Sequence, residues 1–450
     1  MALNLPQPNR TPGKNAFAFI FVTVLIGMTG FGIIVPVMPD LIMEVSGQDR
    51  AFAAQWGGIL SASYAVMQFI FSPVLGALSD RFGRRPVLLG SLAMYSLDFL
   101  LLALAPSLSV LLAARLLAGT FAATFTTANA YIADISPPEK RAANFGAMGA
   151  AFGLGFIVGP LLGGVVGDAY GARAPFFLVA ALGALNLLYG AIVLPETLKP
   201  ENRRPFEWKR ANALGSFRRF QQYPAILPIA LAVFVFQLGH WALPSVWAYF
   251  AGERFDWSAR EIAYSLAFVG LSAAIVQGGL TRIVIPKIGE TASAFFGLTV
   301  AACVMPVYAI ATEAWMVYAA IPIGALVGFV LPALQGIMSR TLPANAQGEL
   351  QGALSSVNGL SMILGPFIMT QTFAAFAAPG TPVTLGPLVL SETGAPFYFP
   401  GAPFVLASVL VITSAVILAA AAPRIARNAS GDADAPAEET LDAGASSPAE

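Results

Sequence analysis

The sequence predicts an all-α integral membrane protein whose twelve transmembrane helices form two pseudo-symmetric six-helix bundles. Three observations support this prediction. Of the 450 residues, 57% are hydrophobic and only 11% are charged, whereas about 25% of the residues of a soluble domain are charged. Twelve apolar runs are long enough to cross a bilayer core. A glycine-proline pattern also recurs in the two halves of the chain.

The positions of the spans follow from the length that a helix needs, which is about 20 residues at a rise of 1.5 Å each. In the first half we expect spans at roughly 16–38, 52–76, 87–105, 108–131, 143–165 and 174–194. In the second half we expect them at roughly 224–248, 261–284, 291–311, 314–338, 349–376 and 401–422. We expect the first run to be a span rather than a cleavable signal peptide, because it is long and contains Pro36 and Pro39.

The distribution of basic residues predicts the orientation. Of the 24 Lys and Arg residues, 19 fall in segments on the side of the N-terminus and 4 on the other side, with Arg115 inside a span. Short cytoplasmic loops retain Lys and Arg, so we expect both termini in the cytoplasm. The expected domains are a cytoplasmic N-terminus (1–15), a first bundle (16–194), a cytoplasmic linker (195–223), a second bundle (224–422) and a disordered acidic cytoplasmic tail (423–450).

Composition excludes several classes of protein. The 24 basic and 24 acidic residues cancel, which argues against nucleic-acid binding because that binding depends on excess Lys and Arg. The single Cys303 and the single His240 provide no disulfide framework and no Cys or His metal cluster. The sequence contains no HEXXH motif, P-loop or paired intramembrane aspartates. We therefore expect no enzyme activity, no metal, no cofactor and no ATP-driven transport.

Internal repetition predicts duplicated halves. Gly159-Pro160 recurs as Gly365-Pro366, an offset of 206, and segment 76–80 recurs weakly at 278–282, an offset of 202. Parallel repeats of this kind are typical of transporters with a site at mid-depth between the halves. The Pro- and Gly-rich segment 377–400 is either a cover over the outer mouth or a plain linker, and we favour the linker.

Three Asp, Arg or His side chains lie deep within the predicted spans: Asp98, Arg115 and His240. Such groups cost about 2.5–3.5 kcal/mol in a bilayer, so each is a candidate functional residue. All three lie roughly 10–12 Å below the outer boundary, counted at 1.5 Å per residue. One hypothesis is that Asp98 or His240 exchanges a proton while Arg115 biases the carboxylate. A static Asp98–Arg115 ion pair is an equally good interpretation.

Aromatic and amide side chains within the spans are candidates for a substrate cavity. Gln237, His240 and Trp241 form a stripe that suits a flat organic molecule. A role of His240 in helix packing is the alternative, and we favour the cavity. Other amides within spans either face substrate or join helices, and the sequence leaves both options open. They are Asn129, Gln277, Gln335 and Asn358.

Residues 76–85, GALSDRFGRR, lie between the second and third predicted spans. They resemble the cytoplasmic G-x-L-x-D-R-x-G-R-R motif of the major facilitator superfamily. Glycines allow a tight turn, and an aspartate at this end can pair with an arginine or cap a helix. A gating role is favoured over a loop that only fixes topology. The candidate gating residues are Gly76, Asp80, Arg81, Gly83, Arg84, Arg85 and, in the next loop on this side, Arg141.

A second motif in the fifth span resembles that of the proton-driven exporters within the superfamily, the drug:proton antiporters. Its residues are Gly155, Gly159, Pro160, Gly163 and Gly164. Small residues allow helices to approach closely, and proline bends a helix; ordinary glycine packing is the alternative. Residues 115–119, RLLAG, are similar to the family's intramembrane arginine motif, and the chain looks most like the tetracycline/proton antiporter branch.

The resemblance implies a secondary active exporter of the inner membrane. It would be a monomer that uses a proton gradient to export drug-like or tetracycline-like amphiphiles, as in multidrug efflux and antibiotic resistance. The chain has Gly27, Ala273 and Ala301 where that branch has an Asp, a His and an Asp tied to metal-tetracycline recognition and proton coupling. The resemblance therefore supports export but does not identify tetracycline. The alternatives are a sugar or metabolite facilitator of the same fold and, from another class, a membrane-embedded receptor or enzyme.

Overall fold

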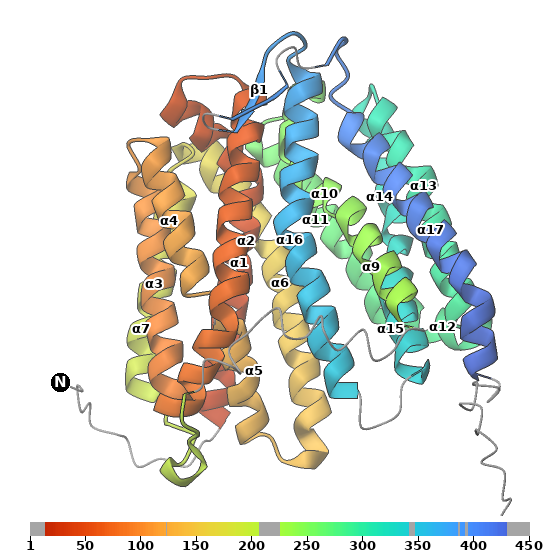
Figure 1. The fold of residues 1–450 in the computed structure, drawn as a ribbon. Coiled ribbons are helices and arrows are strands. Elements are labelled where there is room, and N and C mark those ends of the chain that lie inside the picture. Colours follow the sequence, from red (N-terminus) through yellow and green to blue (C-terminus); the bar gives the residue numbers. More distant parts are fainter. Residues whose placement is uncertain are drawn as a thin grey trace, which may run out of the picture.

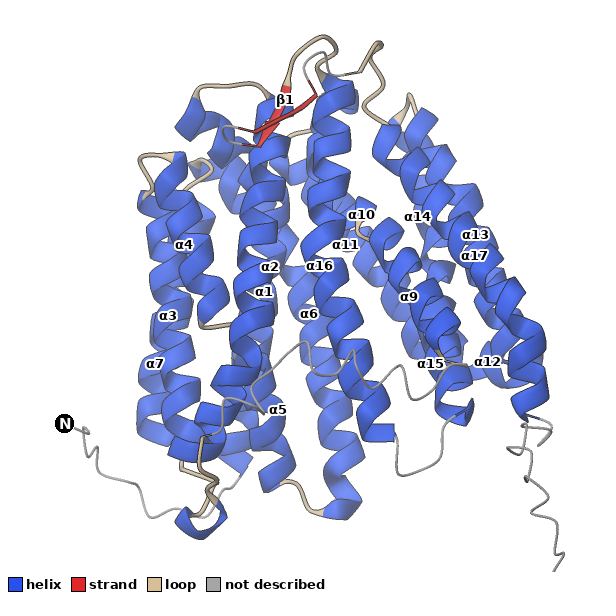
Figure 2. Cartoon of the chain, viewed as in Figure 1, coloured by secondary structure: helices blue, strands red, loops and turns tan. Residues whose placement is uncertain are grey.

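The computed structural model describes residues 14–122, 124–206, 226–341, 347–385, 388–391 and 395–429. Within this part of the chain, twelve helical segments are long and apolar enough to cross a membrane, which confirms the predicted number. Figure 1 shows these helices running between two ends of one bundle, with a small β hairpin at the top. Figure 2 shows that nearly all the described residues are helical.

The first six spans form what we call the N-terminal half. Its spans are continuous helices except for the fourth, which is divided into α4 and α5. The elements are α1 (Lys14–Ser46), α2 (Arg50–Phe82), α3 (Arg84–Leu104), α4 (Leu108–Thr120), α5 (Thr124–Ile135), α6 (Pro138–Tyr170), α7 (Ala174–Val193) and the 3-10 turn η1 (Pro200–Asn202).

The last six spans form the C-terminal half, in which three spans are interrupted. The elements are α9 (Leu227–His240), α10 (Ala242–Phe255), α11 (Ala259–Ile275), the π-helix η3 (Val276–Leu280), α12 (Thr281–Ile288), α13 (Glu290–Ile310), α14 (Ala314–Ala325), the 3-10 turn η4 (Leu326–Phe329), α15 (Val330–Thr341), α16 (Gln347–Ala377), β1 (Val383–Leu385), β2 (Leu388–Ser391) and α17 (Ala402–Ala429). We call the end with β1 and β2 the hairpin end, and the opposite end, with Asp80 and Arg84, the basic end.

Several predicted boundaries require correction. Segment 377–400 is not a plain linker, because its strands pair as an antiparallel hairpin and Ala395 and Phe399 donate backbone hydrogen bonds to the end of α16. Residues 423–429, which we expected in the tail, continue α17. Residues 207–223 of the linker, 430–450 of the tail and most of the predicted N-terminal segment lie outside the described residues.

Two spans predicted as continuous helices are broken near mid-height. The seventh changes from α9 to α10 at Trp241. Pro244 lacks an N–H group, and its ring conflicts with the carbonyl of His240 four residues earlier, which explains the break at this position. The fourth span ends as α4 at Thr120 and begins again as α5 at Thr124.

The halves are related by one offset. Gly83 (φ +108°) and Gly289 (φ +83°) are 206 residues apart, and each adopts the positive φ that favours glycine. Each donates its N–H to the carbonyl four residues back, at 3.1 Å and 2.9 Å. This offset confirms the one between the Gly-Pro pairs. It also corrects the offset of 202, because it pairs Gly76 with Arg282 rather than with Gly278.

The halves join at the hairpin end. α16 packs against α2, and α11 packs against α6. Among the described residues, Gln371 Nε2 donates to the carbonyl of Gln55 at 3.0 Å, and Arg260 forms an ion pair with Asp168 at 2.7 Å. These contacts lie on the hairpin-end side of mid-height, so the structure is closed there.

Candidate functional site

A cavity of about 230 Å³ lies at mid-height between the halves. Helices of the N-terminal half form most of its wall, and α10 and α16 close it from the C-terminal half. Such concave, largely apolar sites with a few polar groups suit organic ligands. The residues that give the wall its character are Phe31, Tyr64, Ser91, Tyr95, Asp98, Phe99, Arg115, Trp241, Ser245 and Tyr249.

Asp98 and Arg115, which the sequence placed at equal depth, form a buried ion pair in this wall. Arg115 Nη2 donates to Asp98 Oδ2, and its guanidinium lies 5.7 Å from the ring centre of Tyr64. Asp98 Oδ1 and Arg115 Nε, both buried, have no hydrogen-bond partner among the residues that the structure describes. Because buried polar atoms are normally paired, the unpaired Asp98 Oδ1 is a candidate acceptor for a proton or for a donor group of a ligand, and Arg115 Nε is a candidate donor.

His240 does not join this pair. Its ring is stacked on Phe236 at 5.5 Å, with an angle of 21° between the rings. Gln237 donates to Asn358 Oδ1 at 3.0 Å, which joins α9 to α16. Among the predicted substrate-cavity residues, Trp241 lines this cavity, together with the ion pair of Asp98 and Arg115. The other predicted cavity residues lie outside its wall. Those outside it are Asn129, Gln237, His240, Gln277, Gln335 and Asn358.

Both helix breaks open onto the cavity, a feature that sequence reasoning missed. Phe121, Ala122 and Thr124 line it where α4 passes into α5, and Trp241 and Pro244 line it where α9 passes into α10. Discontinuous helices are typical of transporter binding sites at mid-membrane. Pro244, placed in the middle of an apolar run, was the available signal for the second break.

The glycines of the fifth span pack α6 against two neighbours. A Cβ on Gly155 would lie 2.6 Å from Met28 Cβ of α1, and a Cβ on Gly159 or Gly163 would press on the α1 backbone. Pro160 packs on Gly32 of the same helix. Gly164 instead faces α11 of the other half, where a Cβ would collide with the carbonyl of Ala259. The motif therefore joins helices within the N-terminal half and also the two halves.

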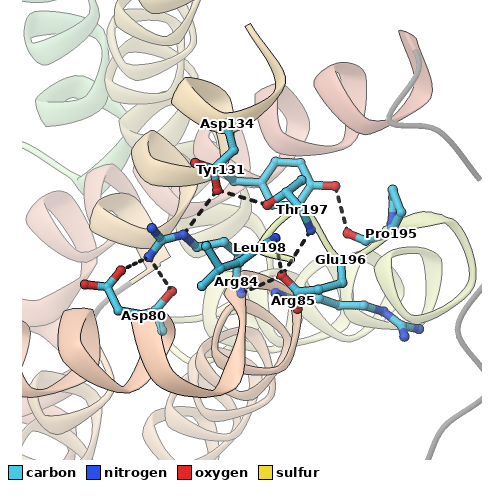
Figure 3. A network of polar contacts seen from close by, with 10 residues as sticks. Asp80, Arg84, Arg85, Tyr131, Asp134, Pro195, Glu196, Thr197 and Leu198 are labelled. Atoms are coloured by element: carbon cyan, nitrogen blue, oxygen red, sulfur yellow. Dashed lines mark hydrogen bonds and ion pairs between the residues drawn. The ribbon is translucent and has the colours of Figure 1, made fainter. Parts of the chain in front are cut away.

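The candidate gating motif is mostly helical rather than a loop. Gly76 to Phe82 lie in α2, and Gly83 alone makes the turn to α3. Arg84 Nη1 donates to Asp80 Oδ1 at 2.6 Å, and its Nε donates to Asp134 Oδ2 at 3.3 Å (Figure 3). The arginine thereby connects α2, α3 and α5 at the basic end.

The other motif residues have separate positions. Arg85 donates from Nη2 to the carbonyl of Ala191 at 2.8 Å and so anchors α7. Arg81 is exposed, with its guanidinium 5.1 Å from the ring centre of Phe82. Arg141 is exposed on α6. Gly76 has open space around it, which shows that no close helix approach requires a glycine there.

Glu196 completes the network, and sequence reasoning missed it. Its Oε1 accepts from the backbone N–H of Arg84 at 2.8 Å, and its Oε2 accepts from that of Arg85 at 3.1 Å (Figure 3). A carboxylate at a helix N-terminus satisfies free N–H groups and interacts favourably with the helix dipole. Tyr131 and Thr197 add bonds to Pro195 and Asp134. The start of the linker is thus bound to the N-terminal half.

Replacing Glu196 with Ala is expected to lower the free energy of unfolding by about 2 kcal/mol, because the first N–H groups of α3 lose their acceptor. Thermal unfolding in detergent measures the change. Glu201→Ala is the matched control, since Glu201 is exposed and 4.0 Å from Lys199, and it should leave the transition unchanged. Equal stability of both variants would contradict the capping role.

Known proteins share both sequence and fold with this chain. A model of the Major Facilitator Superfamily matches residues 20–366. The tetracycline resistance protein, class C, of Escherichia coli is 40% identical over 365 residues, which cover 81% of this chain and 91% of that protein. The class G protein of Vibrio anguillarum is 36% identical over 367 residues, covering 80% and 91% of the two chains.

Solved structures agree at the level of the fold. The human organic anion transporter MFSD10 is similar with a TM-score of 0.64 and 21% identity, covering 91% of this chain and all of that one. A bacterial homologue of the human lysosomal transporter Spinster, in an inward-facing and unoccupied conformation, has a TM-score of 0.70 and 19% identity, covering 94% and 98%. With its twelve spans and a cavity between two halves, the chain is a multi-pass membrane transporter, not an enzyme, and it belongs to the major facilitator superfamily.

Proposed function

We propose that the protein is a secondary active exporter that exchanges protons for an amphiphilic, drug-like compound. The observation that carries the proposal is the buried Asp98, whose Oδ1 is unpaired in the wall of a cavity between the halves. The relationship to tetracycline resistance proteins supports a drug-like substrate. The basic end would face the cytoplasm with both termini, in the inner membrane, and the protein would act as a monomer without a cofactor.

The mechanism follows from what Asp98 can do in the cavity. An ionised Asp98 pairs with Arg115 and offers Oδ1 to a substrate donor group. A proton on Asp98 removes that acceptor and leaves Arg115 without its counter-charge. Proton and substrate would therefore oppose each other's binding, and by linkage each lowers the other's affinity by the same factor. Alternate opening of the cavity at the two ends then converts an inward proton gradient into outward transport.

The aromatic walls favour a flat substrate. Tyr64, Phe99 and Trp241 line the cavity, and aromatic rings are groups on which a planar organic molecule can stack. Vesicles containing the purified protein, with an imposed pH gradient, would be screened with tetracyclines and hydrophobic cations. Accumulation that requires the gradient supports antiport. Equal movement with and without the gradient would contradict it and would favour a facilitator.

Replacing Gly27 with Asp is expected to favour cationic substrates about tenfold over neutral ones. Gly27 lines the cavity, and a Cβ added there would meet nothing within 4 Å. A second carboxylate adds a negative charge in a medium where charges interact strongly. Competition of cationic and neutral amphiphiles for transport measures the preference. Gly27→Asn, equal in size but neutral, is the control; the same preference in both variants would contradict the electrostatic explanation.

A further inference from the structure

The wall of the cavity carries polar groups at two depths. Ser91, Tyr95 and Asp98 all line the cavity and lie on one face of α3, because they are separated by one and two helical turns. Since α3 begins at the basic end, Ser91 lies about 10 Å nearer that end than Asp98, at a rise of 1.5 Å per residue. The hydroxyl of Ser91 and the carboxylate of Asp98 are thus separate polar positions, with an aromatic ring between them.

Two further polar side chains lie at the level of Ser91. Asn186 Nδ2 of α7 donates to Thr23 Oγ1 of α1 at 2.9 Å, and Thr23 lines the cavity. A Cβ on Gly183 or on Gly190 would press on α3; these glycines lie on the two sides of Asn186, and the α3 residues that they meet lie on the two sides of Ser91. The three side chains therefore share one layer, which we call the second polar end of the cavity.

The second polar end has hydrogen-bonding capacity that the described residues leave unused. Thr23, Ser91 and Asn186 are 0%, 2% and 4% exposed, and neither Ser91 Oγ nor Asn186 Oδ1 has a partner within the described part of the chain. Hydroxyl groups inside helices often donate to the carbonyl four residues back, as Ser361 and Thr370 do at 2.9 Å each. Ser91 does not, so its hydroxyl is left for a partner that arrives through the cavity.

The chemistry of this end selects a neutral group. A hydroxyl both donates and accepts hydrogen bonds, so Ser91 and Thr23 match a hydroxyl or an amide of a ligand. Of the described residues that line the cavity, only Asp98 and Arg115 carry a charge, and Asp98 is about 10 Å from Ser91 along the helix. A charged ligand group at the second polar end would lack a counter-charge, and burying an unpaired charge is costly.

We propose that Thr23 and Ser91, supported by Asn186, form a second subsite, which binds a neutral hydroxyl or amide group at the far end of an elongated substrate. This inference rests on the proposed export function and specifies its substrate class. One end of the substrate places a donor group on Asp98 Oδ1, and its flat body lies beside Tyr95. Because all three subsite residues belong to the N-terminal half, this end of the substrate moves with that half when the cavity opens.

Two matched probes test the subsite by direct binding to the purified full-length protein. One probe is an aminoacridine with a butyl chain that ends in a hydroxyl group. The other is its pentyl analogue, in which a methyl group replaces the hydroxyl. Fluorescence polarisation measures the affinity of each probe, and the ratio of the two affinities isolates the hydroxyl group. A partly inactive sample does not change this ratio, because both probes are compared on the same protein.

We expect Ser91→Ala to lower the preference for the hydroxyl probe about fivefold, which corresponds to the loss of one net hydrogen bond. Ser96→Ala is the matched control and should leave the ratio unchanged. Ser96 lies in the same helix, and its Oγ is also unpaired among the described residues, but it does not line the cavity. The double variant Thr23→Val/Asn186→Leu removes both members of the other hydrogen bond together and should lower the ratio as Ser91→Ala does.

The charge of the chain end provides a second measurement. A third probe, whose butyl chain ends in an ammonium group, should bind to wild type more weakly than the hydroxyl probe. Tighter binding of the ammonium probe would overturn the proposal. So would an equal ratio in wild type and Ser91→Ala, which would mean that water alone occupies this end, or the failure of wild type to bind either of the matched probes.

Probe binding requires no gradient, so the outcome for the subsite is separate from the outcome for export. If the ratio falls in Ser91→Ala but no probe is transported by a pH gradient, the subsite stands and the proposed exporter function fails. Gradient-driven transport of the probes with the same ratio in wild type and Ser91→Ala would contradict the subsite alone.

Discussion

Replacing Asp98 with Asn is expected to reduce gradient-driven export at least 100-fold, with the protein still folded. Asn keeps the shape of the side chain and an oxygen that can accept from Arg115, but it cannot exchange a proton. Removing one partner of a buried ion pair costs about 3–5 kcal/mol, and the remaining hydrogen bond offsets part of this cost. Uptake into vesicles with an imposed pH gradient, together with thermal unfolding, measures both effects.

The double variant Asp98→Asn/Arg115→Gln distinguishes coupling from a static pair. It removes both charges, so no charge is left buried without a partner. If the pair only satisfies two buried charges, export should recover in this variant. If Asp98 carries the proton, gradient-driven export should stay absent while substrate still exchanges across the membrane without a gradient. Asp98→Glu, which keeps a carboxyl group, should retain part of the coupling. Recovery of gradient-driven export in the double variant would contradict the proton role.

Replacing Gly164 with Val is expected to reduce transport at least tenfold by opening the hairpin end. Gly164 of α6 is buried, and any side chain there would collide with the carbonyl and Cβ atoms of α11 in the other half. Overpacking costs about 1–3 kcal/mol, and here that cost falls on the conformation in which the halves meet. The fraction of molecules with a closed hairpin end, measured by spin-label distances across this end, should fall accordingly.

Gly153→Val is the matched control, because Gly153 lies in the same helix and has nothing within 4 Å of its Cβ position. We expect normal transport from that variant. If both variants transport equally well, or if Gly164→Val fails without changing the distances, Gly164 does not act at the interface between the halves.

The fold was predictable from the sequence because hydropathy reflects the bilayer directly. Twelve apolar runs gave twelve spans, and the scarcity of charge singled out Asp98 and Arg115, which do form a pair. The depth of each residue could be counted along its helix, whereas its rotation about the helix axis could not. The sequence therefore could not show that Trp241 lines the cavity while its neighbour His240 lies outside the wall.

The features that sequence reasoning missed depend on backbone atoms or on distant partners. Glu196 binds N–H groups more than 100 positions away, and every residue has such groups, so no side-chain pattern reveals them. The break after His240 requires Pro244 to be considered as a helix breaker rather than as one apolar residue among others.

The central claim is that one cavity opens in turn to both ends of the molecule, and a single cysteine at Gly27 tests it most directly. Gly27 lines the cavity and has room for a side chain, so the variant Gly27→Cys in a Cys303→Ser background places one thiol there. A membrane-impermeant thiol reagent is then applied to either face of oriented vesicles. We expect labelling from both faces, with a ratio that shifts with the pH gradient and a rate that falls when substrate is present. Labelling from one face only under every condition would contradict alternating access.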